Sequence, residues 1–146
     1  MISKGSNLPD EDHVMRYVPW SRLRKDEDEN VFGILPQALA PRENEQPLSL
    51  NWLEYFSGDR DQRIRDSVSV FRRSMRVEAK SGYGVGNVGQ IKEICDSYGA
   101  RVRIVYDPEA DNLAHSEIRR LPRDDLGLLD ALAAQAFVDL VCDAEV

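Results

Sequence analysis

The sequence predicts a small α+β protein in which a mainly antiparallel or mixed sheet carries three helices packed mostly on one face. Three observations indicate this class. Short β-branched, aromatic and alternating runs dominate the first half of the chain, so most of the sheet would come from there. Apolar residues at helical spacing dominate the second half. One compact apolar run, typical of a buried strand, separates the last two helical patterns.

The chain has the size of a single domain. Its 146 residues are too few for two full domains, and 42% of apolar residues is enough for one core. Residues 1–12 are polar and acidic, so we expect a flexible lead-in there. Residues 13–146 would then form the α+β domain.

Three segments of the first half have strand patterns. Residues 14–20 combine β-branched and aromatic side chains and reach a proline near their end. Residues 31–35 are a short apolar run that a proline closes. Residues 48–52 alternate apolar and polar side chains, and beyond them the pattern fits a short helix. The charged residues 24–30 and the polar residues 41–47 would be loops.

Two helices are predicted in the middle of the chain. Residues 59–75 place apolar side chains at spacings of four, three and four, which form one face of a helix. Ser57 or Asp59 would cap its N-terminus. Residues 88–98 carry the second helical pattern, and Gly99 would end it.

The last third of the chain has one strand pattern and the strongest helical pattern. Residues 102–106 form a compact apolar run that the turn pair Asp107-Pro108 closes. Residues 124–142 are predicted to be one helix with an acidic first turn. Its apolar stripe consists of Leu128, Leu129, Leu132, Ala136, Phe137, Leu140 and Val141.

Charge and composition exclude several classes of protein. A net charge of −7 argues against non-specific binding to nucleic acid or to an anionic membrane. The sequence contains no apolar run long enough for a transmembrane helix and no signal-peptide core, so we expect a cytoplasmic protein. Cys95 and Cys142 are predicted to be free thiols among apolar residues. The two cysteines and two histidines form no zinc signature, and we expect no metal and no cofactor.

A glycine-rich run fits the pattern G-x-G-x-x-G through Gly84, Gly86 and Gly89, with Asn87 between them. In a dinucleotide-binding unit such glycines let the backbone approach a pyrophosphate. The preceding residues are too polar for the buried strand that this fold requires, and the remaining chain is too short for it. We therefore favour a glycine-rich turn before a helix. The start of that helix could still hold a phosphate on its free N–H groups.

A second candidate is the segment 107–118, which follows a predicted strand and is rich in polar side chains. His115 could act as a base or hold a ligand, because polar groups at strand ends often carry chemistry. The alternative is that Asp107 and Pro108 make a turn, Asn112 caps a short helix and His115 is a packing or surface residue. We favour this alternative, because the sequence shows no partner constellation for His115.

Two further sets of polar residues have similar alternatives. Alternation places Ser49 and Asn51 together on one face of a strand, where they would line a pocket or form the wet side of the sheet. Arginines and acidic residues are interleaved over residues 60–76, which is typical of a solvated helix with internal ion pairs. A phosphate-contacting stripe is the other interpretation, and Arg119, Arg120 and Arg123 would extend it.

Three short segments together resemble a known group of sequences. They are residues 14–20, residues 48–52, and the loop that contains Asp107-Pro108 and then Asn112, Ala114 and His115. They are similar to a broad group of small uncharacterised bacterial proteins with an arginine-bearing first strand, a Leu-Ser-Val-like segment and a D-P…N-x-A-H loop. That group has no established activity, so the resemblance implies none. It directs attention to Arg16, Ser49, Asn51, Asn112 and His115.

The sequence favours a small cytoplasmic interaction or accessory protein, of the kind encoded in bacterial defence or toxin–antitoxin-like operons. Small size, acidity and the long apolar stripe support this hypothesis. The stripe would bind a protein partner or a second copy of the chain. Residual exposure of Leu129, Leu132, Phe137 and Leu140 in the folded monomer is the expected sign.

Two alternatives remain open. A small enzyme would act on a nucleotide or a nucleic-acid phosphate in a pocket where Arg16, Ser49, Asn51 and His115 converge, with phosphate also held by the glycine-rich run. Arg16 would neutralise the phosphate and His115 would move a proton, so the two side chains must lie on the same side of the fold. Nucleic-acid binding through the arginine-rich helix 60–76 is the weakest hypothesis, because of the net negative charge.

Overall fold

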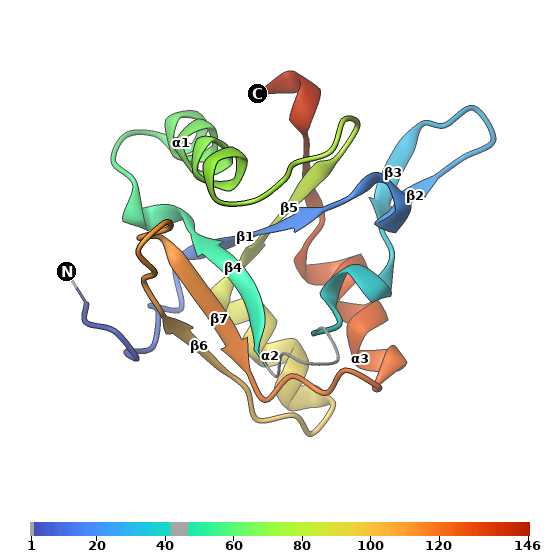
Figure 1. Cartoon of the computed structure of the whole chain (residues 1–146). Helices are drawn as coiled ribbons and strands as arrows, with labels where there is room; N and C mark the ends of the chain where they lie inside the picture. Colours follow the sequence, from blue (N-terminus) through green and yellow to red (C-terminus); the bar gives the residue numbers. More distant parts are fainter. Residues whose placement is uncertain (1, 42–46) are drawn as a thin grey trace.

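A computed structural model describes residues 2–41 and 47–146 (Figure 1). The fold is α+β, as the sequence predicts, and each pair of neighbouring strands in the main sheet is antiparallel. The six strands of this sheet lie in the order β6 (Arg103–Tyr106), β7 (His115–Arg119), β4 (Leu48–Trp52), β1 (His13–Val18), β5 (Gly82–Asn87) and β8 (Asp139–Cys142). A separate hairpin consists of β2 (Leu23–Lys25) and β3 (Val31–Ile34).

Helices cover both faces of the sheet. The helix α1 (Arg60–Ser74) packs on one face, where Met15 and Tyr83 belong to the same apolar cluster. The helices α2 (Val88–Ser97) and α3 (Leu126–Ala131) pack on the other, and a π-helical turn η4 (Leu132–Ala136) continues α3. Val14 and Val18 face this second layer, because side chains alternate along β1. Two of the three helices therefore share one face.

Local signals explain most of the predicted elements. Asp59 caps α1 by accepting a hydrogen bond of 2.9 Å from the backbone N–H of Gln62. Gly99 follows α2 with a φ of +76°, a left-handed conformation that favours glycine. The strand predictions for residues 14–20, 31–35, 48–52 and 102–106 are confirmed within a few residues.

The glycine-rich run is the first major correction. Residues 82–87 form β5, a strand between β1 and β8, and not a turn. A Cβ atom on Gly86 would lie 3.2 Å from the carbonyl oxygen of Ala136 and 3.3 Å from a ring carbon of Phe137. The glycines therefore leave the space that η4 and Phe137 occupy against the sheet. This reason is tertiary, so strand propensity misses it.

The C-terminal helix is the second correction. The predicted helix over residues 124–142 ends at η4, and Leu140 and Val141 belong to the edge strand β8, which pairs with β5. Phe137 leaves the helical conformation with a ψ of 49°. The stripe of this segment is mostly core: Leu129 and Leu132 are 0% exposed and Phe137 is 1% exposed.

Smaller differences concern the predicted loops and the lead-in. Residues 5–8 are not a free lead-in, because they lie along β6 through backbone hydrogen bonds such as that from Leu8 to Ile104. The first residues of the predicted loop 24–30 belong to β2, and β7 begins inside the predicted loop 107–118. The predicted loop 41–47 lies mostly outside the described residues. None of the helices in the described part of the chain has the length and apolar character needed to cross a bilayer.

Asp12, which precedes β1, gives a testable pH dependence. Its carboxylate accepts a hydrogen bond of 2.9 Å from the indole nitrogen of Trp52. Burial nevertheless raises the pKa of Asp12 above its ordinary value of 3.8, although this hydrogen bond acts in the opposite direction. The folded state then holds this proton more tightly than the unfolded state. The stability that Asp12 contributes is therefore complete below pH 3.8 and is lost as the pH rises through the folded pKa.

An Asp12→Asn variant, whose amide oxygen still accepts from Trp52, should lack this loss. Urea unfolding of both proteins between about pH 3 and pH 7 measures the effect. The variant is expected to gain stability relative to the wild type as the pH rises. A stability difference that stays constant across this range would contradict the prediction.

Candidate functional site

The main sheet is split between two of its central strands. β1 pairs with β4 at only two positions, Val14 with Trp52 and Met15 with Asn51. β1 nevertheless continues to Val18, and it stays paired with β5 along its whole length. The N-terminal half of β4 is therefore separated from the C-terminal half of β1. A gap opens inside the sheet instead of at its edge.

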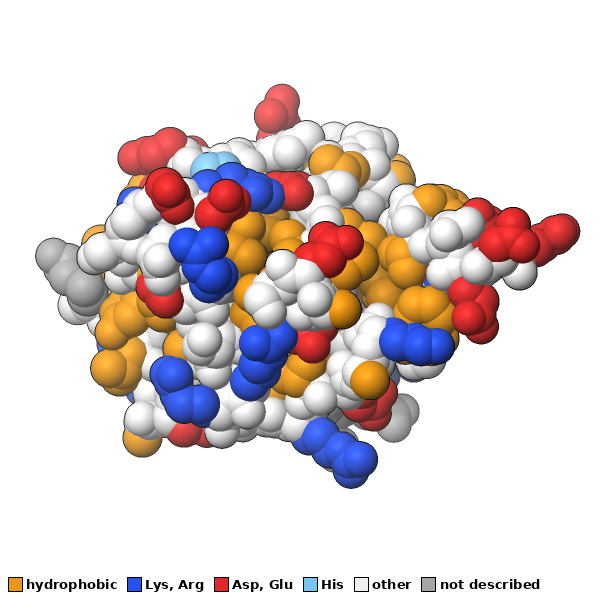
Figure 2. Space-filling view, turned by 90° about the horizontal axis from the view of Figure 1, so that it is seen from above, with side chains coloured by type: hydrophobic (Ala, Val, Ile, Leu, Met, Phe, Trp, Pro, Cys, Tyr) orange, Lys and Arg blue, Asp and Glu red, His pale blue; other side chains and the backbone are white. Residues whose placement is uncertain are grey.

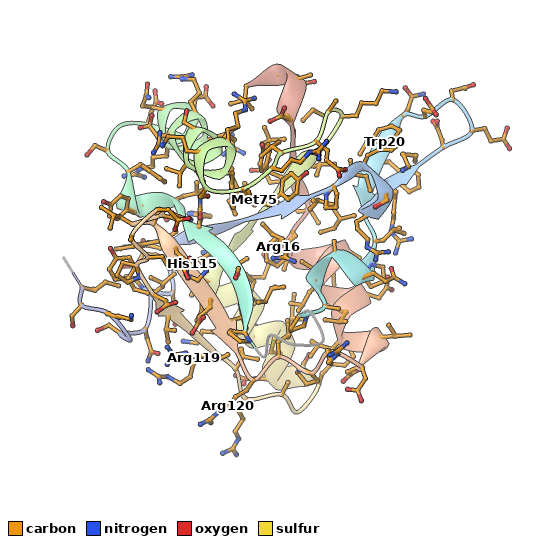
Figure 3. All side chains as sticks on the ribbon, viewed as in Figure 1. Arg16, Trp20, Met75, His115, Arg119 and Arg120 are labelled. Atoms are coloured by element: carbon orange, nitrogen blue, oxygen red, sulfur yellow. The ribbon has the colours of Figure 1, made fainter. Side chains whose placement is uncertain are left out.

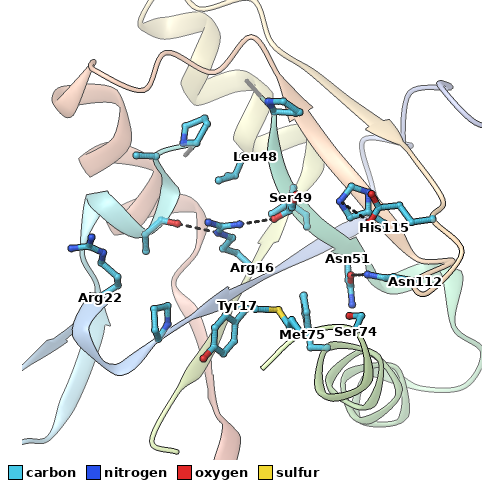
Figure 4. Close-up of a pocket in the computed structure, with 18 of the residues that line it drawn as sticks. Arg16, Tyr17, Arg22, Leu48, Ser49, Asn51, Ser74, Met75, Asn112 and His115 are labelled. Atoms are coloured by element: carbon cyan, nitrogen blue, oxygen red, sulfur yellow. Dashed lines mark hydrogen bonds and ion pairs between the residues drawn. The ribbon is translucent and has the colours of Figure 1, made fainter. Parts of the chain in front are cut away.

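A pocket of about 800 Å³ occupies this gap (Figure 4). Its walls come from both strands, from a 3₁₀ helix η2 (Pro36–Leu39), from the C-terminal end of α1 and from the loop between β6 and β7. Polar residues that line it include Arg16, Arg22, Ser49, Asn51, Ser74, Glu109, Asp111, Asn112 and His115.

Arg16 crosses the split. Its Nε donates a hydrogen bond of 3.0 Å to the carbonyl oxygen of Ala38, and its Nη1 donates one of 2.9 Å to the carbonyl oxygen of Ser49 (Figure 4). The first bond reaches η2 and the second reaches β4. The guanidinium group is therefore held at a fixed position in the pocket wall, where it brings a permanent positive charge.

His115 begins β7 and is oriented by Asp107. Its Nδ1 lies 2.9 Å from the backbone oxygen of Asp107 and 3.2 Å from a carboxylate oxygen of the same residue. Both atoms are acceptors, so Nδ1 carries the hydrogen and Nε2 is the nitrogen with a lone pair in the neutral ring. The side chain is 10% exposed, and a carboxylate oxygen of Glu109 lies 3.7 Å from Nε2.

A buried chain of amides holds the loop that carries His115. The Nδ2 of Asn112 donates a hydrogen bond of 2.7 Å to the Oδ1 of Asn51, whose Nδ2 donates one of 3.1 Å to the Oγ of Ser67 in α1. The Oδ1 of Asn112 accepts a hydrogen bond of 3.0 Å from the N–H of Ala114. Asn51 and Asn112 are buried, so their main effect is to position the pocket wall.

Five of the residues that the sequence singles out thus lie around one pocket: Arg16, Ser49, Asn51, Asn112 and His115. The register between β4 and β7 places His115 directly opposite Asn51. Figure 3 shows Arg16 and His115 on neighbouring parts of the sheet. The enzyme hypothesis requires these two side chains on the same side of the fold. Both line the pocket, but they leave the sheet on opposite faces, because His115 and Asn51 share the face of Met15 whereas Arg16 shares the face of Val14 and Val18. Asn112 does not cap a helix, because its side chain closes the turn before β7.

The glycine-rich run lies elsewhere, in β5 and at the start of α2. The backbone N–H groups that a phosphate would need there already have partners. Those of Val88 and Gly89 donate to the carbonyl oxygens of Asp12 and Asp10, each at 2.9 Å. That of Gln90 donates to the side chain of Asn87, which is the N-cap of α2. The phosphate hypothesis needs free N–H groups at the start of this helix. These three donors already have acceptors, so they are not free for a phosphate.

Sequence reasoning misses several residues in and beside the pocket. Glu109 lines the pocket and Asp107 contacts His115 from outside the lining; both belong to a segment that the sequence marks as polar, but their contacts with His115 depend on how the loop folds. Arg22 follows the first strand, and Ser74 ends α1, with no local signal that they share a pocket. The distance in sequence between these elements explains why no pattern connects them.

The remaining candidate surfaces lose support from the structure. Leu129, Leu132 and Phe137 are buried in the monomer's own core and Leu140 is half-buried, so the stripe is not the predicted interface. On α1, Arg60 pairs with Asp139, and Arg72 lies 2.9 Å from the carboxylate of Asp143.

Three arginines of this set, Arg60, Arg63 and Arg72, therefore form ion pairs on a mixed surface. Positive and negative side chains alternate on the face that Figure 2 shows. Arg119 and Arg120 lie far from α1 in Figure 3 and do not extend its basic residues. The pocket is thus the best supported candidate site. Comparison of the chain with protein-family models, with curated proteins and with solved structures finds no match.

Proposed function

We propose that this protein is a small enzyme that binds a phosphate-bearing small molecule, such as a nucleotide, in the pocket between β1 and β4. The observation that carries the proposal is that the fixed guanidinium of Arg16 and the oriented imidazole of His115 line the same pocket. An arginine at a fixed position is suited to a phosphate, and a histidine oriented by a carboxylate is a common reactive group.

The pocket is lined by both positively and negatively charged side chains, which lie in different parts of it. Figure 4 shows Arg22 toward one end, His115 at the start of β7 toward the other, and Arg16 between them, while Glu109 lines the pocket from the β6–β7 loop. The ligand would place its phosphate near the arginines and present its other polar groups to His115. Because Arg22 is exposed and lines the pocket, its side chain is accessible to an incoming ligand.

Replacing Arg22 with alanine is expected to weaken the binding of the phosphate ligand at least tenfold, which is about 1.4 kcal/mol. A thermal-shift screen of nucleotides and sugar phosphates identifies the ligand, and calorimetry then measures its affinity. A ligand at about 100 times its Kd should add about 2.7 kcal/mol of stability. Arg73→Ala is the matched control, because it removes the same charge from an exposed position that does not line the pocket.

Two results would contradict this proposal: no phosphate compound shifts the melting temperature, or Arg22→Ala binds as tightly as the wild type. A His115→Asn variant separates binding from chemistry. It should keep the ligand affinity within a few-fold and lower the turnover of the bound ligand by about 10² to 10⁴. If His115→Asn and the wild type turn the ligand over equally, His115 has no catalytic role. The protein would then be a binding protein and not the proposed enzyme.

A second candidate is the accessory protein of a bacterial operon, and the β2–β3 hairpin supports it. The hairpin projects from the molecule (Figure 1), its turn is acidic, and Phe32 is 68% exposed. A basic partner protein would suit this surface. Phe32→Ser should weaken binding of an identified partner, whereas Leu113→Ser, at a 54% exposed position elsewhere, should not. We place the protein in the cytoplasm in either case, and its two free cysteines suit a reducing compartment.

A further inference from the structure

The end of the pocket at the β6–β7 loop holds a compact group of metal-binding side chains. Asp107, Glu109 and His115 each offer a ligand atom, and these atoms all lie within 4.8 Å of one another. Glu109 and His115 also line the pocket. An imidazole together with carboxylates is a donor set that transition-metal ions favour, and a purely acidic cluster is not.

His115 and Glu109 lie close together but are not hydrogen-bonded. The Nε2 of His115 and the carboxylate oxygen of Glu109 are 3.7 Å apart, which is too long for a hydrogen bond. In the tautomer with its hydrogen on Nδ1, which the two Asp107 oxygens favour, Nε2 offers a lone pair 3.7 Å from the carboxylate oxygen of Glu109. A positive ion between these two atoms would be attracted to both.

The spacing also suits a metal ion. Zinc binds histidine nitrogen and carboxylate oxygen at about 2.0 to 2.2 Å with tetrahedral angles, so two of its ligand atoms lie about 3.4 Å apart. The observed 3.7 Å needs only a small adjustment of Glu109, whose side chain is 51% exposed. Asp107 already contacts the other ring nitrogen, as the outer carboxylate does in many metal-bound histidines.

We propose that His115 Nε2 and the carboxylate of Glu109 bind a divalent transition-metal ion, with Zn²⁺ as the best match, while Asp107 orients the ring. The ion's other positions face the pocket and take water or an oxygen of the bound ligand. This deepens the proposed function, because His115 then acts through the metal instead of moving a proton itself. It also makes metal and phosphate ligand raise each other's affinity by the same factor, if both contact the ion.

The two histidines of the chain provide a direct test on the full-length protein with Zn²⁺ alone. His13 is an internal control, because a carboxylate oxygen of Glu54 contacts its Nδ1 at 2.8 Å in the same way, but within the described residues His13 belongs to no group of metal-binding side chains. Nitrogen NMR of the imidazoles should show a saturable shift of the His115 Nε2 signal, and a much smaller change at His13. A larger change at His13, or no change at either ring up to millimolar Zn²⁺, would overturn the proposal.

Calorimetric titration with Zn²⁺ tests the second ligand. Glu109→Gln should weaken zinc binding at least tenfold, and His13→Asn should leave it unchanged. Equal zinc affinity in Glu109→Gln and the wild type would overturn the assignment of Glu109 as a ligand. The Glu109 side chain is 51% exposed, so Glu109→Gln should leave the fold intact, and a urea unfolding curve verifies this. Phosphate-ligand binding is measured without zinc, so failure of the metal site leaves the Arg22→Ala result standing.

Discussion

Replacing Phe137 with alanine is expected to lower the free energy of unfolding by about 3 to 5 kcal/mol. The ring is 1% exposed and lies against the backbone of β5, where Gly84 and Gly86 leave room for it. Removing it would create a cavity that the surrounding backbone cannot fill, because η4 and β5 are both fixed by other contacts. Equilibrium unfolding in urea measures the loss.

Val138→Ala is the matched control for Phe137→Ala. Val138 is the next residue and is 63% exposed, so its truncation should change stability by less than about 0.5 kcal/mol. These two variants also test whether the apolar stripe forms the core of the monomer or an interface between molecules. If Phe137→Ala costs less than about 1 kcal/mol but changes the oligomeric state, the apolar stripe acts between molecules and our interpretation of it is wrong.

Replacing Asn51 with alanine is expected to cost about 2 to 4 kcal/mol. Its side chain is 0% exposed and bonds both Asn112 and Ser67. The alanine variant would leave an N–H of Asn112 without its acceptor inside the core, and such an unsatisfied group costs about 1 to 3 kcal/mol. The Ser67 hydroxyl would lose the hydrogen bond that it accepts from Asn51 but keep the one that it donates to the sulfur of Met15. Urea unfolding measures the loss, and Ser49→Ala, at an exposed position on the same strand, is the control.

A double variant sharpens the Asn51 prediction. If the two amides act as one unit, Asn51→Ala with Asn112→Ala should cost less than the sum of the single changes, by at least about 0.5 kcal/mol. Strict additivity would mean that the hydrogen bond between them contributes little. The double variant should also loosen the β6–β7 loop, which hydrogen exchange at Ala114 and His115 would detect.

How far the sequence predicts the fold depends on whether the decisive interactions are local. The helix α1 is predicted well because Asp59 caps it and its apolar face recurs at helical spacing. The strand β5 is missed because its glycines have no strand preference of their own and are selected by Phe137, which is distant in sequence. The strand β8 is missed because a short apolar run fits either a helix or a strand.

The same distinction applies to the candidate site. Alternation places Ser49 and Asn51 on one face, and the resemblance to small bacterial proteins draws attention to Arg16 and His115. Each of these signals lies within one segment. That the segments line a common pocket follows from the strand order and from the separation of β1 and β4, which no pattern in the sequence reports. For the same reason the role of Asp107 as partner of His115 is visible only in the structure.

The short pairing between β1 and β4 has a mechanical consequence. It joins two panels, one of β6, β7 and β4 and the other of β1, β5 and β8, mainly at one end. A small change in the angle between these panels widens or narrows the gap without breaking the pairing inside either panel. Arg16 in β1 ties the two panels together, because its side chain donates hydrogen bonds to Ala38 in η2 and to Ser49 in β4. A ligand wider than the gap must therefore break the hydrogen bond between Arg16 and the carbonyl oxygen of Ser49 before the panels can separate.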